Sequence, residues 1–278
     1  IENGQGFTVS SLRVETVTPE IARLLVAGGQ KTLTIAPEAA TDRLRRVIGK
    51  PLASVSGSPL RSDPETSVFE AVSNARDASI HRVKLYFMVG HPTETDEDIE
   101  GIVDLTLKAR AIFRRNLAIN ATPFVPKAHT PFQWAAQLPL EESRRRIGWL
   151  QERLRQEGLQ LKWQNPEASL LEGLWARGDR RLAPLLLEAY RRGCRFDGWS
   201  DRFRFDLWQA SMESLGIDPH EVVYKERDRQ APLPWDHIDI GVTRAFLLEE
   251  WSRAQQAEAT PDCRDGDCQA CGVCDFGD

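Results

Sequence analysis

Four of the five cysteines of this 278-residue sequence lie within twelve residues near its C-terminal end. They form the pattern C-x4-C-x2-C-x2-C, made by Cys263, Cys268, Cys271 and Cys274. Because Gly266 and Gly272 let the backbone turn and point its N–H groups at the sulfurs, the thiolates can converge on one centre. Zinc held by four thiolates and an iron–sulfur cluster both fit this spacing. The pattern therefore predicts a metal site and leaves the metal open.

The remaining cysteine, Cys194, stands alone in "RRGCRFDGW", and we interpret it as a small buried side chain. Residues 1–193 contain no cysteine, whereas a secreted disulfide protein would scatter its thiols, so we expect reduced thiols. The sequence shows neither a run of about 18 apolar residues nor a basic start followed by an apolar stretch. These features predict a cytoplasmic protein without a membrane partner. A net charge of -5 argues against wholesale electrostatic binding of nucleic acid.

A second group of candidate residues lies in "KLYFMVGHPTETDEDI". Gly90 follows an apolar strand at its carboxyl end, where parallel α/β folds place ligands and where a missing Cβ lets the backbone approach a cofactor. Thr95 and Asp98 have the spacing of a helix capping box. Taken alone, this stretch favours a structural turn.

Two further clusters have a functional and a structural interpretation. "PWDHID" places Asp236, His237 and Asp239 beside Trp235, a group that can bind metal or transfer protons. Without a defining spacing, a loop anchored by Trp235 is the favoured interpretation. The basic stretch "SRRRIGWLQERLR" can contact RNA, but its interleaved glutamates favour a solvated helix face.

The elements that would position these residues alternate between strands and helices from Phe7 to about Phe124, a pattern typical of a parallel sheet. Strands are predicted at residues 7–15, 31–36, 82–89 and 117–126. Helices are predicted at residues 18–27, 40–49, 65–79 and 96–113. The third strand is so continuously apolar that we expect it to be covered on both faces. Four such units form an arc and do not close an eight-stranded barrel.

Long helical patterns follow from about Leu138. They cover "LEESRRRIGWLQERLRQEG", "PEASLLEGLWARG", "DRRLAPLLLEAYRRG" and "FRFDLWQASMESLG". We therefore predict an α/β domain at 1–137, a helix-rich region at 138–260 and a cysteine-rich metal-binding tail at 261–278.

The order of three motifs resembles the radical SAM enzymes. These motifs are "SSLRVETVTPEIARLLVAGGQKTLTIAPEAATDRLRRVIGK", "KLYFMVGHPTETDEDI" and "ATPFVPKAHTPFQWA". Within that superfamily the sequence is similar to the group with a cobalamin-binding-like N-terminal domain. The later "RGDRRLAPLLLEAYRRGCRFDGWSDRF", "LPWDHIDIGV" and the cysteine run resemble one poorly characterised subfamily of this group.

The resemblance implies a partial (β/α)6 TIM-like barrel in which strands three to six are present. The first residue is Ile and the opening does not resemble a domain start, so we expect an N-terminally truncated chain. The family's motifs place three residues toward the methionine and ribose of S-adenosylmethionine (SAM): Ser11, Arg13 and Glu38. They place six more at the adenine side: Gly90, Pro92, Glu94, Phe124, Val125 and Pro126. The structural alternatives are an Arg13–Glu38 ion pair at the sheet edge and a loop stop at Pro126.

The departure from the family concerns the principal cluster. Radical SAM chemistry uses C-x3-C-x2-C to hold a [4Fe-4S] cluster that binds SAM, and no cysteine precedes Cys194. The tail has a different spacing and follows the helical region, so we predict that this chain alone does not cleave SAM.

The resemblance also implies what the intact parent would do. It would reductively cleave SAM to modify a substrate, with flavodoxin or ferredoxin as electron donor, an auxiliary iron–sulfur cluster or zinc at the tail, and cobalamin in the parent. The substrate expected by analogy is RNA or a ribosomal protein. The alternative is a non-catalytic binding module with a structural four-cysteine zinc site.

Overall fold

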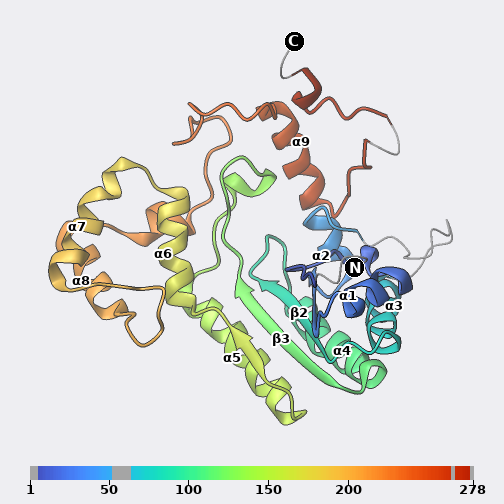
Figure 1. The fold of residues 1–278 in the computed structure, drawn as a ribbon. Helices are drawn as coiled ribbons and strands as arrows, with labels where there is room; N and C mark the ends of the chain where they lie inside the picture. The colour runs from blue at the N-terminus through green and yellow to red at the C-terminus, as the bar shows by residue number, and fades with distance from the viewer. Residues whose placement is uncertain (1–5, 52–63, 264–266, 276–278) are drawn as a thin grey trace. The chain divides into compact units, whose positions relative to one another are not determined.

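The computed structural model describes residues 6–51, 64–263 and 267–275. Contacts divide the chain into two compact units, shown in Figure 1. The first unit consists of Ile1–Pro123, Glu142–Gln164 and Ser252–Pro261. The second consists of Phe124–Glu141, Asn165–Trp251 and Asp262–Asp278.

The first unit contains a parallel four-stranded sheet in the order β1-β2-β3-β4 (Figure 1). Its strands are β1 (Thr32–Glu38), β2 (Arg82–Val89), β3 (Asn116–Pro123) and β4 (Leu161–Trp163). Parallel neighbours need crossover connections, and α3 (Pro64–Asp77), α4 (Asp96–Phe113) and α5 (Leu140–Gln156) supply them. The α/β class with a partial TIM-like arrangement is therefore confirmed.

One face of this sheet is fully buried and the other is partly open. Along β2 the buried positions alternate with half-buried ones, and β1 and β3 show the same period of two. The buried side chains are Leu33, Ile35, Val83, Leu85, Phe87, Val89, Leu117, Ile119 and Ala121. The expectation that β2 is covered on both faces was wrong, because Lys84, Tyr86 and Met88 lie on its half-buried face.

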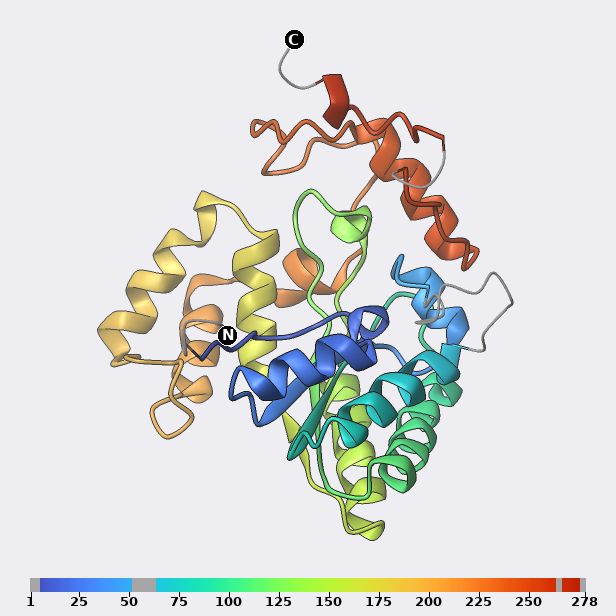
Figure 2. The same cartoon turned by 45° about the vertical axis from the view of Figure 1, so that its right-hand side comes forward.

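Helices α1 (Pro19–Ala27), α3 and α4 cover the buried face. In Figure 2 they lie side by side along the sheet, and α3 contacts both of its helical neighbours. Their apolar side chains form one continuous core with those of the strands and α5. Burial of this area is the main stabilising contribution to the first unit.

The expected first strand at residues 7–15 forms only a single parallel bridge between Leu12 and Ile35. The backbone then enters the 3-10 turn Val14–Thr16, whose N–H groups bond locally instead of to β1. Sequence reasoning missed β4, because a strand of three residues offers too little of the alternating pattern for detection.

Threonine caps fix the helix starts in this unit. The Thr18 hydroxyl accepts from the Ile21 N–H before α1, and Thr41 accepts from the Leu44 N–H before α2 (Asp42–Val47). Thr95 forms the expected capping box at α4, which confirms that interpretation. These caps set where the chain turns after β1 and β2.

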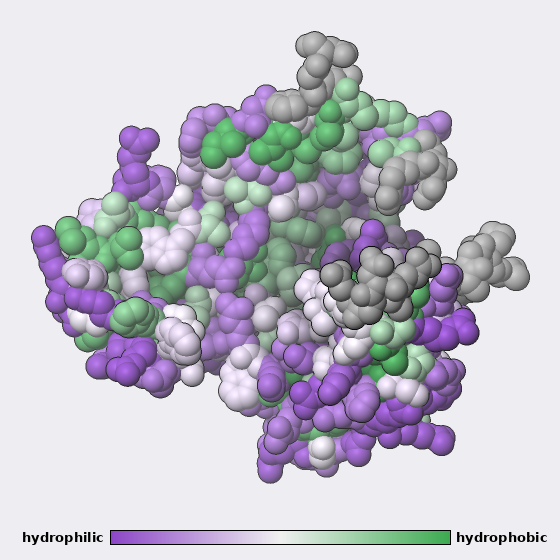
Figure 3. All heavy atoms as spheres, viewed as in Figure 1, coloured by the Kyte–Doolittle hydropathy of each residue, from purple (hydrophilic) through white to green (hydrophobic). Residues whose placement is uncertain are grey.

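The second unit is helical, and its described helices have the following bounds. They are α6 (Pro166–Arg177), α7 (Ala183–Arg192), α8 (Phe205–Leu215), α9 (Arg244–Gln255) and the π-helix His220–Tyr224. Short 3-10 turns lie at Pro131–Trp134, Arg180–Leu182 and Val273–Asp275. Two apolar clusters hold this unit, one around Leu174 and Trp208 and one around Trp134 and Trp251. Figure 3 shows apolar atoms at the surface over α7, and this helix has three exposed large hydrophobic residues, Leu186, Leu187 and Tyr190.

No helix in the described ranges is both long and apolar enough to cross a bilayer.

Candidate functional site at the carboxyl edge of the sheet

The carboxyl ends of β1, β2 and β3 meet at one edge of the first unit's sheet. Glu38 pairs with Phe87 after an irregularity in β1, and Val89 pairs with Pro123. Glu38 has a φ of 65° and Gly90 a φ of 96°. The backbone is therefore left-handed at the end of β1 and directly after β2. This conformation is strained for glutamate, and such strain is concentrated at functional sites.

Glu94 ties the turn after β2 to α5. Its Oε2 accepts from the Gly90 N–H at 2.6 Å and from the Arg146 guanidinium at 2.6 Å. Its Oε1 is buried and has no hydrogen-bond partner in the structure as described. Burial raises the pKa of Glu94 to about 7, against the lowering effects of Gly90 and Arg146. A buried carboxyl oxygen without a partner is a place where a ligand's polar group can bind.

His91 lies beside Glu38 at the same edge and is 4% exposed. Burial lowers the pKa of its imidazole to about 4, whereas the neighbouring Glu38 backbone raises it. The nearby Lys50 charge also lowers this pKa. The ring is therefore neutral at pH 7.

Asp98 connects α2 with α4. Its carboxylate accepts from the Thr95 N–H at 2.9 Å, from the Thr41 hydroxyl and from the Arg43 guanidinium. Burial opposes ionisation, but these donors keep the pKa of Asp98 below its usual range. Arg43 also donates to the carbonyl of Thr93 at 2.8 Å, so the network holds the turn after β2 on both sides.

The residues expected near the methionine and ribose of SAM have separate partners. Glu38 forms an ion pair with Lys50 at 2.9 Å, whereas Arg13 pairs with Glu15 at 2.6 Å. The Arg13–Glu38 ion pair considered as an alternative is therefore not formed. Ser11 and Arg13 are exposed before the first 3-10 turn.

The remaining sequence-predicted residues divide between the units. Gly90, half-buried Pro92 and Glu94 share one turn of the first unit. Phe124, Val125 and Pro126 follow β3 directly, are buried, and belong to the second unit. There the Phe124 ring packs edge-on against Phe132, with centroids 5.5 Å apart. Their assignment to adenine remains a prediction.

The tail thiols are accessible. Cys263, Cys268 and Cys274 are exposed, and Cys271 is half-buried. The Ala270 N–H donates to the Cys268 sulfur at 3.4 Å, the type of contact that stabilises thiolates. Within the described part of the chain, no three His, Cys, Asp or Glu side chains are grouped to hold a metal ion. Shared metal binding by these thiols remains a prediction that rests on their type and spacing.

The backbone of the tail is anchored to the loop before α9. The Thr243 N–H donates to the Cys271 carbonyl at 2.8 Å. Gly272, with a φ of 95°, lies so close to this loop that a Cβ would be 2.7 Å from the Gly241 carbonyl oxygen. Glycine is therefore required here by a close backbone approach.

The "PWDHID" segment and Cys194 have the structural roles favoured above. The Trp235 indole is buried and donates to Gln133 Oε1 at 2.6 Å, which anchors the loop. Asp236 accepts from Arg244 at 2.8 Å, and His237 is exposed. Cys194 is 6% exposed, and burial raises the pKa of its thiol.

Three charged or polar residues of the edge were missed by sequence reasoning. His91 stands between Gly90 and Pro92 in the motif, a position that signals proximity to the strand end. Arg146 was assigned to a solvated face, yet its side chain is only 13% exposed and pairs with Glu94. Arg43 carried no signal, because its partner Asp98 is distant in sequence.

Part of the first unit is similar to a known superfamily. Residues 2–106 match the radical SAM superfamily. The match covers β1, β2 and most of α4, and it supports the superfamily expected from the motif order. The subgroup with a cobalamin-binding-like domain and the N-terminal truncation remain predictions.

One relative is an uncharacterized protein of Methanocaldococcus jannaschii, 36% identical over 183 residues. The aligned region is 66% of this chain and 37% of that protein. The chain thus spans little more than a third of the length of this relative.

Proposed function

We propose that the carboxyl edge of the first unit's sheet is part of the SAM-binding face of a radical SAM enzyme. The observation that carries this proposal is the overlap between the superfamily match at residues 2–106 and the edge formed by Glu38 and Gly90. Ligands of parallel α/β sheets bind at such carboxyl ends. The proposed contact residues are those that share this edge, namely Glu38, Gly90, Pro92 and Glu94.

The residues at the edge fit a polar ligand in two respects. Glu94 Oε1 is buried without a partner in the described structure and can accept from an amino or hydroxyl group. Gly90 leaves room for close approach of a ring. SAM bound beside a reduced [4Fe-4S] cluster supplies a carbon-centred radical that abstracts hydrogen from a substrate.

The principal cluster does not fit residues 1–193, which contain no thiol. This chain's own contribution is therefore to bind and orient SAM. Glu94 and Arg146 would hold the turn after β2, and neutral His91 would support Glu38 without adding charge to the edge.

Calorimetric titration of the 278-residue chain with SAM tests this proposal. We expect binding that is lost in Gly90→Val, because the branched side chain strains left-handed backbone and occupies the space beside the edge. The matched control is Gly29→Val. Gly29 has a similar φ of 92°, lies after α1 at the opposite end of β1, and has nothing within 4 Å of a Cβ. Equal SAM affinity in the two variants would contradict the proposal.

We further propose that the tail thiols bind metal, as an auxiliary iron–sulfur cluster or as zinc. Support comes from the spacing of the four cysteines and from the Ala270 N–H that donates to Cys268. Anaerobic reconstitution followed by measurement of iron, zinc and visible absorption distinguishes the two. Cys271→Ser should reduce the amount of bound metal. Cys194→Ala should not, because Cys194 is buried in the apolar cluster around Leu174 and Trp208. Zinc in a colourless protein that does not bind SAM would favour the binding module.

For the whole protein we propose RNA or a ribosomal protein as substrate and flavodoxin or ferredoxin as electron donor, with cobalamin in the parent. These proposals rest on analogy with related modification enzymes. A filter-binding assay with ribosomal RNA and with ribosomal proteins, compared with an unrelated RNA, tests the substrate class.

A further inference from the structure

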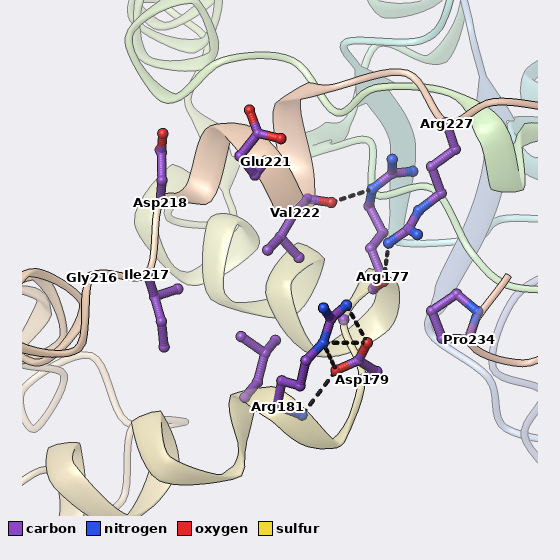
Figure 4. Close-up of a pocket in the computed structure, with 12 residues that line it drawn as sticks. Arg177, Asp179, Arg181, Gly216, Ile217, Asp218, Glu221, Val222, Arg227 and Pro234 are labelled. Carbon is purple, nitrogen blue, oxygen red and sulfur yellow. Dashed lines mark hydrogen bonds and ion pairs between the residues drawn. The ribbon is translucent and has the colours of Figure 1, made fainter. Parts of the chain in front are cut away.

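A pocket of about 530 Å³ in the second unit lies between α6, the turn after it and the π-helix. Figure 4 shows three arginines at its centre and right, while Asp218 and Glu221 stand at the opposite side. The volume is that of a site for a small molecule. Leu182, Ile217 and Val222 provide apolar lining.

Arg177, at the end of α6, is fully buried. Its guanidinium donates to the carbonyls of Ala135, Val222 at 3.1 Å and Lys225 at 2.9 Å. Burial and the nearby Arg227 charge lower the pKa of Arg177 to about 10, so it stays protonated at pH 7. Carbonyl dipoles hold this cation in place without neutralising it.

Arg227 lies against Arg177 and is half-buried. One of its terminal nitrogens donates to the Arg177 carbonyl, and its guanidinium carbon lies 5.4 Å from the centroid of the Trp235 ring. Its Nε is buried, and no acceptor for it exists in the described structure. Arg227 therefore keeps one buried donor without an acceptor, and other atoms of its side chain line the pocket.

The carboxylates near these two arginines are occupied or remote. Asp179 binds Arg181, whose Nε and terminal nitrogen reach both carboxyl oxygens at 2.7–3.0 Å (Figure 4). Glu221 is exposed and pairs with Lys225. Across the described ranges, neither Arg177 nor Arg227 forms an ion pair with a carboxylate. The Asp179 carboxylate also attracts the Arg227 charge, so one carboxylate serves the guanidinium groups of Arg181 and Arg227 while Arg177 has none. Such an excess of positive charge around a buried arginine is costly unless an anion offsets it.

We propose that this pocket binds the oxyanion group of a small molecule, a phosphate or a carboxylate, with the Arg227 guanidinium as its main donor. A guanidinium presents its N–H groups as a planar fork that matches two oxygens of either group. The accessible part of the Arg227 guanidinium lines the pocket and would donate to the oxyanion, and the Arg177 charge adds attraction. This site is independent of the proposed SAM-binding edge.

Line broadening in NMR spectra of the 278-residue chain tests the proposal with two probes at constant ionic strength. One arm uses inorganic phosphate observed by ³¹P, and the other uses ¹³C-labelled acetate. We expect saturable broadening of at least one probe, and the responding arm identifies the oxyanion. Arg227→Gln should weaken this binding about tenfold or more.

Arg229→Gln is the matched control, since it removes the same charge two residues away and Arg229 does not line the pocket. It should leave the affinity within about twofold of the unchanged chain. Absence of saturation by either probe up to about 10 mM would overturn the proposal. Equal affinities of the two variants would also overturn it.

Chemical modification keeps the test open if Arg227→Gln does not fold. The unchanged chain is treated with phenylglyoxal, and the modified arginines are mapped by mass spectrometry. The responding anion should slow modification of Arg227 and leave Arg229 unaffected. Equal rates with and without both anions would overturn the proposal.

Discussion

Glu94 in the first unit and Arg177 in the second are both buried, yet their surroundings differ. Glu94 has Arg146 as an oppositely charged partner at 2.6 Å. Arg177 has backbone carbonyls and a second cation, Arg227. In the first unit the chain itself provides the counter-charge, and the network holds a turn in place. In the second unit Arg177 has no carboxylate partner among the described residues, and the carboxylate that attracts Arg227, Asp179, is already bound to Arg181. The proposed anion would offset this excess of positive charge.

This difference teaches how the two networks should respond to mutation. A network whose charges are paired within the chain depends on pH and on its own partners. A network that lacks a partner depends on an added anion. The following predictions test the difference, beginning with the largest effect.

Arg177→Met should lower the free energy of unfolding by about 4 kcal/mol, because three buried carbonyls lose their charged donor. Urea denaturation provides the measurement, and exposed Arg180→Met provides the control. A loss below about 1 kcal/mol would show that burying the Arg177 charge costs nearly as much as its hydrogen bonds contribute.

His91 and Glu94 should oppose each other in the pH dependence of stability. The pKa of Glu94 is raised from 4.5 to about 7, so its contribution is complete below pH 4.5 and is lost as the pH rises toward 7. The pKa of His91 is lowered from 6.5 to about 4, so its contribution is complete above pH 6.5 and is lost as the pH falls toward 4. Each shift corresponds to about 3 kcal/mol at most.

Substituting either residue should therefore reveal the pH dependence of stability that the other one causes. As the pH increases from 4.5 to 6.5, the free energy of unfolding of Glu94→Gln should increase more than that of the unchanged chain, because only the His91 contribution remains. Over the same pH range, the free energy of unfolding of His91→Asn should decrease relative to that of the unchanged chain, because only the Glu94 contribution remains. Glu152→Gln is the control, because Glu152 is exposed and pairs with Arg155 outside this network. The pKa of Glu152 is lowered by its bonds to Gln156 and Arg155, so its contribution is lost only below pH 4.5. Parallel profiles of the His91 and Glu94 variants would contradict the assigned burial.

Asp98→Ala should cost about 2 kcal/mol, because α4 loses its capping box and Arg43 loses its partner. Glu97→Ala removes an acidic residue from the same first turn and leaves the bonds of Asp98 to Thr41 and Arg43 in place. It removes the bond between Glu97 and the Thr95 side chain, and it should cost clearly less than Asp98→Ala because Glu97 is exposed. Thermal unfolding of the two variants measures the difference. Equal costs would show that the network contributes only through the helix dipole.

Much of the sheet could be predicted from the sequence, because its pattern is local. The predicted strand at residues 82–89 has the bounds observed for β2, and Thr95 with Asp98 located the start of α4. The strand expected at residues 7–15 does not form beyond a single bridge to β1, because backbone hydrogen bonds within the 3-10 turn Val14–Thr16 replace bonds to β1. Periodicity reports side-chain faces, but it does not report which backbone bonds form.

The site was only partly predictable, because its partners are brought together by the fold. Gly90 was identified from its place after a strand. The ion pair that holds its turn joins Glu94 to Arg146 across 52 residues, and the basic stretch gave no reason to single out one arginine. Arg177 and Arg227 likewise meet across 50 residues, and the excess of guanidinium groups over carboxylates around them becomes visible only in three dimensions.

Hydrogen–deuterium exchange with and without SAM tests most directly whether the sheet edge is the functional site of the first unit. The account predicts slower exchange in peptides covering the turn from Gly90 to Asp98, with no change in peptides covering Arg177 to Leu182. Unchanged exchange at the turn, or protection confined to the second unit, would contradict it.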